Sequence, residues 1–144
     1  MGCSACANAC PVQCIRMLRD EEGFLYPTGD AERCLNCHLC ERVCPCLNVE
    51  EKIKVLTDES EAHAVICADF AMFNNAGSGG AFSLLARYAL KQGWYVAGAV
   101  WTDDWSVKHI VSKSPETVRL MAGTKYLQSS MGSVYGEIKG LLLH

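Results

Sequence analysis

The cysteines of residues 34–45 carry the clearest chemistry in this sequence. Cys34, Cys37, Cys40 and Cys44 are followed by Pro45, which gives the pattern C-x2-C-x2-C-x3-C-P. Three thiolates at this spacing can wrap one cuboid iron–sulfur cluster, and the fourth cysteine, displaced and followed by proline, ligates the other cluster of a pair. A zinc site would use two C-x2-C pairs separated by a longer loop. The spacing therefore predicts a [4Fe–4S] motif.

An earlier group of cysteines repeats part of this motif. Cys3, Cys6 and Cys10 precede Pro11 and give C-x2-C-x3-C-P, so the position of a first cysteine falls ahead of Met1. We therefore expect a motif cut short at its front. Because the fourth cysteines exchange, the two motifs predict one complete [4Fe–4S] cluster and a second, incomplete one with three cysteines. The expected ligands are Cys10, Cys34, Cys37 and Cys40 for the first, and Cys3, Cys6 and Cys44 for the second.

Three further cysteines lie outside these ligand sets. Cys14 and Cys46 are expected to be small buried apolar residues near a cluster, with replacement of the missing ligand as the alternative for either. Cys67 lies in an apolar segment and is expected in the core. His38, inside the second motif, either hydrogen-bonds a cluster sulfur or points to solvent.

Composition excludes several classes of protein. Nine of the ten cysteines fall within residues 3–46, whereas a disulfide framework would staple the whole chain. The net charge of -3 and the lack of a basic stripe argue against a nucleic-acid partner. No apolar run reaches the ~20 residues of a membrane helix, and no basic segment followed by an apolar one marks a secretory signal. We expect a cytoplasmic protein without membrane insertion.

The composition changes near residue 50. Residues 1–49 form the cysteine-rich module, in which IRML and FLYP read as a hairpin that turns at DEEG. Residues 50–62 are charged and are expected to be a linker. Residues 63–144 read as a partial α/β domain, so the expected fold class is α+β. Strands are expected at 63–70, 94–101 and 106–113, a glycine-rich loop at 74–80, helices at 80–93, 114–123 and 133–143, and an extended segment at 124–130.

Residues 1–49 resemble bacterial two-cluster ferredoxins. The stretches NNAGSGGAFSLLARYAL, WYVAGAVWTDDWSVKHI and MAGTKYLQSSMGSVYGEIK resemble the coenzyme F420 hydrogenase/dehydrogenase beta-subunit family. Its marks are S-G-G opening a helix, here residues 78–80, and G-[ST]-K-Y-x-Q-S, here residues 123–129. The resemblance covers only the first part of the family's flavin domain, so we expect an N-terminal fragment with little turnover by itself.

The resemblance implies electron relay between [4Fe–4S] clusters and FAD. It also implies a ferredoxin or an oxidoreductase subunit as redox partner, and F420 as one hydride acceptor. Backbone N–H groups at the start of a helix favour an anion such as the flavin pyrophosphate, with Lys125 as countercharge. The alternative for this loop is a serine N-cap with glycine flexibility. The residues implied at the flavin are Ser78, Gly79, Gly80, Lys125, Tyr126, Gln128 and Ser129.

Two other functions stay open at this point. One is a stand-alone ferredoxin-type carrier, in which residues 63–144 serve docking or support and no flavin binds. The other is a structural or regulatory module that holds zinc or a redox-sensing cluster. The sequence contains no nucleophile–base arrangement and no P-loop, so we expect no catalytic side chain. His109, on a strand, is expected to face outward.

Overall fold

The computed structural model describes residues 2–49, 61–74, 76 and 78–143. The chain divides into two compact units, Met1–Glu61 and Ala62–His144. The linker expected at 50–62 lies almost wholly outside the described residues. Within the described parts of the chain, no helix is long and apolar enough to cross a membrane.

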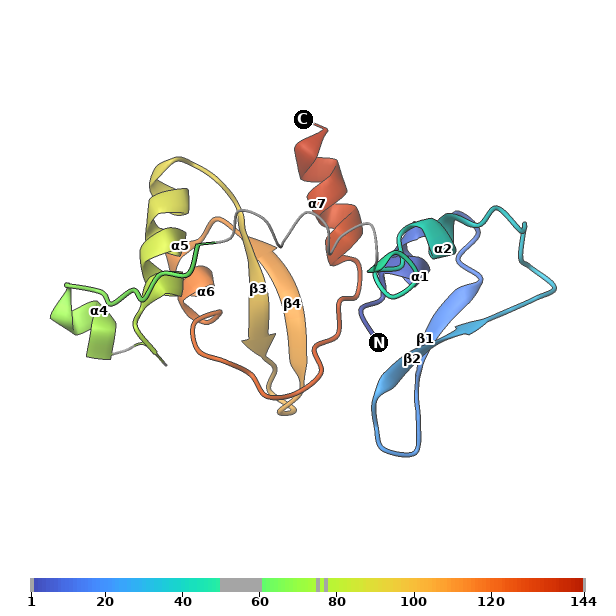
Figure 1. Cartoon of the computed structure of the whole chain (residues 1–144), viewed down its shortest axis with the longest axis horizontal. Helices are drawn as coiled ribbons and strands as arrows, with labels where there is room; N and C mark the ends of the chain where they lie inside the picture. Colours follow the sequence, from blue (N-terminus) through green and yellow to red (C-terminus); the bar gives the residue numbers. More distant parts are fainter. Residues whose placement is uncertain (1, 50–60, 75, 77, 144) are drawn as a thin grey trace. The chain divides into compact units, whose positions relative to one another are not determined.

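The first unit is built on an antiparallel hairpin (Figure 1). Strand β1 (Ile15–Arg19) pairs with β2 (Leu25–Gly29), with Ile15 opposite Gly29 and Arg19 opposite Leu25. The Asp20 carboxylate accepts hydrogen bonds from the backbone N–H groups of Glu22 and Phe24 at 3.1 and 2.8 Å, and Gly23 supplies a φ of 87°. Aspartate and glycine are favoured in such turns for these reasons, and the hairpin prediction is confirmed.

The sequence repeat of the first unit is also a structural repeat. Helix α1 (Ala5–Ala9) follows Ser4, and helix α2 (Leu39–Arg42) follows His38. Both preceding residues have left-handed backbone, with φ of 60° and 56°. Each of them comes directly after a cysteine of its motif. Since α1 packs against α2, the two copies of the motif meet at this helix pair.

The second unit is a small mixed assembly of helices and strands. Its two-stranded antiparallel sheet joins β3 (Val96–Trp101) to β4 (Val107–Ser112). Helices α5 (Ala81–Lys91) and α6 (Pro115–Arg119) pack on β3, and α7 (Val134–Leu142) packs on β4. The core consists of Ala86, Val100, Val118 and Met121, with Leu90, Val96 and Ile110 packed against it. The predictions of helices over 80–93 and 133–143 and of strands over 94–101 and 106–113 are confirmed.

The helix expected from Ser114 is shorter than the sequence suggested. The Ser114 hydroxyl accepts a hydrogen bond from the N–H of Thr117 at 3.3 Å, and Pro115 occupies the first turn, as expected of a cap. The helix ends at Arg119 rather than near Gly123. After Arg119 the N–H groups bond three residues back instead of four, for example Met121 to Val118 at 3.0 Å, so the chain tightens and leaves the α-helix.

Two expected extended segments are not strands. Residues 63–69 form no strand, and helix α4 (Phe70–Asn74) begins at the end of that segment. The N–H of Cys67 donates instead to the carbonyl of Gly79 at 2.7 Å, so the segment pairs with the glycine-rich loop. Residues 124–130 contribute a single bridge, between Ser130 and Lys108 of β4. An extended chain without a neighbouring strand along its length has no ladder to join.

Candidate iron–sulfur site

A cavity of about 270 Å³ in the first unit brings five cysteines together. Cys10 and Cys14 reach it from the segment ahead of β1, and three cysteines reach it from the second motif. Apolar side chains, among them Val12, Ile15 and Leu35, complete the wall. The four cysteines expected to hold the complete cluster therefore face one apolar cavity: Cys10, Cys34, Cys37 and Cys40.

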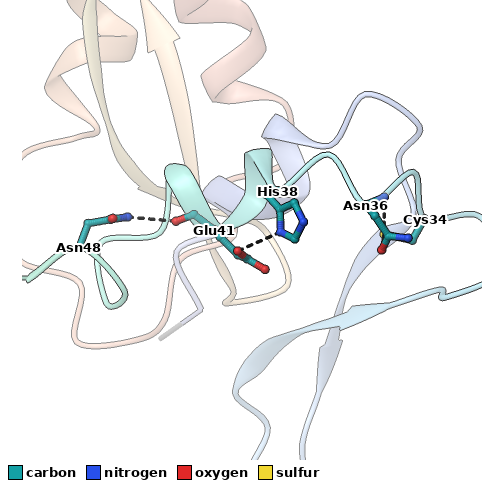
Figure 2. A network of polar contacts seen from close by, with 5 residues as sticks. All are labelled: Cys34, Asn36, His38, Glu41 and Asn48. Atoms are coloured by element: carbon teal, nitrogen blue, oxygen red, sulfur yellow. Dashed lines mark hydrogen bonds and ion pairs between the residues drawn. The ribbon is translucent and has the colours of Figure 1, made fainter.

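Backbone N–H groups point at the sulfurs of this cavity. The N–H of Cys14 donates to the sulfur of Cys10 at 3.3 Å, and the N–H of Asn36 donates to the sulfur of Cys34 at 3.4 Å (Figure 2). The first contact is the main reason why the pKa of Cys10 lies below its ordinary value. Thiolates that accept N–H donors beside an apolar cavity suit an iron–sulfur cluster, so the residues present fit the group that the motif implies.

Cys14 is buried beside Cys10, as the sequence predicted. Its side chain is 5% exposed, and its sulfur lies 3.4 Å from the sulfur of Cys10. The hydrogen bond between the two thiols, together with burial, raises the pKa of Cys14 to about 11. Cys46 differs, because it is exposed, so the expectation that it is a buried apolar residue is wrong.

The remaining expected ligands, Cys3, Cys6 and Cys44, do not line this cavity. Partial burial is the main cause that raises the pKa of Cys6, and the neighbouring charge of Cys3 adds to it. The N–H groups of Leu47 and Cys46 lower the pKa of Cys44. In the described part of the chain, no group of three His, Cys, Asp or Glu side chains is close enough together to hold a single metal ion. Each thiolate of a cuboid cluster binds a different iron, so the ligands of a cluster need not meet at a point.

Asn48 organises the loop that carries Cys44, and spacing rules for cysteines did not point to it. Its side-chain amide donates to the carbonyls of Glu41, Arg42 and Cys44 at 3.0, 3.3 and 2.8 Å. Figure 2 shows the contact with Glu41. Asparagine is favoured where backbone groups at the end of a helix need a side-chain partner, which is the signal that could have found it. Figure 2 also shows His38, whose Nδ1 lies 3.1 Å from a carboxylate oxygen of Glu41.

A second candidate site lies at the glycine-rich loop of the second unit. A cavity of about 490 Å³ is lined by residues 78–83 and by residues 121–124, which join two stretches that are far apart in the sequence. Gly80, with φ of 82°, is the N-cap of α5 and offers no side-chain cap. The serine N-cap alternative is therefore wrong for this helix, and the first turn of α5 borders the cavity without a capping side chain.

The two glycines of this loop are required by close contacts. A Cβ on Gly79 would lie 2.2 Å from the carbonyl oxygen of Val65, and one on Gly80 would lie 2.9 Å from the Cβ of Cys67. The loop is thus pressed against the segment that precedes α4.

The other residues implied at a flavin are not among the described residues that line this cavity. The Lys125 ammonium donates to the carbonyls of Leu120 and Ala122 at 3.0 and 2.8 Å, and burial lowers the pKa of Lys125. Tyr126 is 90% exposed, and Gln128 is half-buried. The structure therefore brings Ser78, Gly79 and Gly80 together with the chain that precedes Lys125. Among the described residues, the side chains of Lys125, Tyr126, Gln128 and Ser129 do not line this cavity.

His109 and Ser129 contact one another. The Nδ1 of His109 lies 2.7 Å from the Ser129 hydroxyl, and both residues are half-buried. The expectation that His109 faces outward is wrong, because the bridge of Ser130 to β4 covers this part of the strand.

Each of the two units matches a model of a known protein family. Residues 1–48 match the family model of the 4Fe-4S dicluster domain. This match indicates that the cysteine-rich unit binds [4Fe–4S] clusters. The class of protein is therefore an iron–sulfur electron-transfer protein. Residues 63–135 match the N-terminal model of the coenzyme F420 hydrogenase/dehydrogenase beta subunit.

The second match spans half of the chain, and the chain belongs to the coenzyme F420 hydrogenase/dehydrogenase beta-subunit family. The resemblance seen in the sequence is thereby confirmed. None of the curated proteins compared with the chain matches it. Together the two matches indicate electron transfer in an oxidoreductase, and membership of a beta-subunit family indicates partner subunits.

Proposed function

We propose that this chain relays single electrons between [4Fe–4S] clusters and FAD, as the iron–sulfur part of a flavin-dependent oxidoreductase subunit. The observation that carries the proposal is the cavity in which Cys10 meets Cys34, Cys37 and Cys40. Cys10 belongs to the first motif and the other three to the second, which is the exchange of ligands that two-cluster spacing requires.

The proposed role of each group follows from its chemistry. A [4Fe–4S] cluster supplies one-electron redox chemistry when it is bound. Cys10, Cys34, Cys37 and Cys40 would hold one cluster, and Cys3, Cys6 and Cys44 would contribute three ligands to the other. The N–H groups of Cys14 and Asn36 stabilise thiolate charge, and apolar side chains line the cavity beside the sulfurs.

The flavin part of the proposal rests on the second cavity. The open first turn of α5 and the neighbouring glycines suit an anion such as a pyrophosphate, because helix N-termini carry unpaired N–H groups and a positive dipole end. Residues 123–124 line the same cavity, so both marks of the family border one space. Ser78, Gly79 and Gly80 are the residues we assign to the flavin from this geometry.

A stand-alone ferredoxin-type carrier is the alternative function. One observation favours the carrier: the Lys125 ammonium, expected as the countercharge of the flavin pyrophosphate, already donates to two backbone carbonyls. Purification with added FAD separates the two functions: retained flavin supports the relay, and a chain that holds iron but no flavin supports the carrier.

The ligand exchange is tested by single cysteine variants, reconstituted with iron and sulfide without oxygen. Cys10→Ala and Cys37→Ala should each remove about four irons and the same EPR signal, because their thiolates hold one cluster. Cys44→Ala should affect the other signal. Cys67→Ala, a buried cysteine of the second unit, is the control and should keep both. If Cys10→Ala removed the signal that Cys3→Ala or Cys6→Ala removes, the exchange of ligands would be refuted.

A further inference from the structure

Cys14 is a fifth cysteine at a site that needs four. It lines the same cavity as the four expected ligands. Its position is set by a tight turn, in which the N–H of Gln13 donates to the carbonyl of Cys10 at 3.2 Å and Gln13 takes a φ of 51°. The turn returns the chain so that both the N–H and the thiol of Cys14 meet the sulfur of Cys10, at 3.3 and 3.4 Å.

The direction of the thiol contact follows from the chemistry of Cys10. A cysteine that ligates iron is a thiolate and can only accept a hydrogen bond, so Cys14 must be the donor. At 5% exposure Cys14 is shielded from water that would compete for this bond. A hydrogen bond in such surroundings is stronger than the same bond in water.

The equivalent position of the second motif holds a different residue. Aligning the two Cys-Pro pairs places Asn48 at the position that Cys14 occupies, four residues after the displaced cysteine. The Asn48 amide donates to the carbonyl of Cys44 at 2.8 Å rather than to a sulfur. The sulfur of Cys10 is thus contacted by the residue four positions on, whereas the pKa of Cys44 is lowered by the N–H groups of Leu47 and Cys46 and by the Cys46 side chain.

We propose that the Cys14 thiol donates a hydrogen bond to the Cys10 thiolate and thereby raises the reduction potential of the cluster that Cys10 ligates. The inference rests on the proposed function, since it needs that cluster. Reduction adds negative charge that spreads onto the ligand sulfurs, and a donor stabilises the reduced state more than the oxidised one. Cys14 is a positioning residue that acts through Cys10, and it ligates no iron.

The test compares Cys14→Ala with Cys14→Ser in the full chain, reconstituted without oxygen. The readouts are iron per chain and an EPR-monitored redox titration, with the signal lost in Cys37→Ala marking the cluster of interest. We expect full iron content in both variants. In Cys14→Ala the equilibrium constant for reduction of this cluster should fall by up to about tenfold, which lowers its midpoint potential by up to about 59 mV for one electron. Cys14→Ser keeps a donor and should stay close to the unsubstituted chain.

The control is Cys67→Ala, an equally buried cysteine of the second unit, which should leave both midpoints unchanged. An unchanged midpoint in Cys14→Ala at full iron content would overturn the inference. Iron loss in Cys14→Ala would also overturn it, because Cys14 would then help to hold the cluster. Equal shifts of the midpoint potentials of both clusters in Cys14→Ala would also overturn the inference. Failure of the unsubstituted chain to bind iron would instead refute the proposed function itself.

Discussion

At the scale of single residues, Asn48 shows how one side chain holds the loop of Cys44 in place. Its amide bonds three carbonyls at the end of α2 and in the Cys44 loop. We expect Asn48→Ala to lower stability by about 1 kcal/mol, because the half-buried carbonyl of Cys44 and the exposed carbonyls of Glu41 and Arg42 lose a donor that water only partly replaces. The loss should appear as a fall in the temperature at which cluster absorbance disappears, by about 4–8 °C for each kcal/mol.

The matched control for this prediction is Asn8→Ala in the equivalent helix α1. The Asn8 amide donates to the carbonyl of Ser4 at 3.1 Å. Alanine has the higher helix propensity, which offsets the loss of that bond, so the temperature should hardly change. Equal effects of the two substitutions would show that Asn48 has no special part in holding the Cys44 loop.

Residue spacing predicted some of this site and missed the rest for a physical reason. The separations of Cys34, Cys37 and Cys40 are fixed by the cluster they would hold, so the chemistry can be read directly from the sequence. The roles of Asn48 and Lys125 depend on which carbonyls a turn presents, and no spacing rule encodes that. The same limit explains the wrong expectations for Cys46 and His109, whose exposure depends on neighbouring segments.

At the scale of elements, the glycine-rich loop depends on two residues without side chains. In Gly79→Ala the new Cβ would lie 2.2 Å from a backbone oxygen, which cannot move aside as a flexible side chain can. We expect this substitution to cost roughly 2–3 kcal/mol, as overpacking of a close contact does. Denaturant unfolding followed by tryptophan fluorescence measures it, since Trp94, Trp101 and Trp105 all lie in the second unit.

Gly136→Ala is the control and should have the opposite sign. Gly136 lies inside helix α7, and a Cβ there would meet no atom within 4 Å. Alanine should therefore stabilise the unit by about 0.5–1 kcal/mol through its helix propensity. A similar loss in both variants would mean that Gly79 is not held by contact with Val65.

Elements with a strong local signal were predictable, and those that depend on a distant partner were not. The helix at Ala81–Lys91 has an apolar face and ends near Gly93, and the hairpin at Asp20–Gly23 has its turn chemistry in the sequence. Residues 63–69 are apolar enough for a strand, yet the N–H of Cys67 donates to the carbonyl of Gly79 in the glycine-rich loop. Apolar composition therefore identified the burial of Cys67 but not the backbone conformation around it.

At the scale of the whole molecule, the two units differ in how much apolar surface they bury. Among the described residues of the first unit, Ser4 and Cys14 alone are buried. The second unit has a core around Val100, Val118 and Met121. A module of about 50 residues with so few buried side chains needs metal ligation or cross-links to stay folded. We infer that the first unit relies on its clusters for stability, whereas the second relies on its core.

Removal of iron should therefore affect the units unequally. After chelation without oxygen, trypsin should cut faster at Arg16 and Arg19 of β1, because the hairpin loses the ligated segments that support it. Cleavage at Arg87 in α5 should keep its rate, and the wavelength of tryptophan emission should not move. Mass spectrometry of the fragments with and without iron measures this difference. Faster cutting at Arg87 after chelation would show that the core of the second unit is not sufficient to hold it.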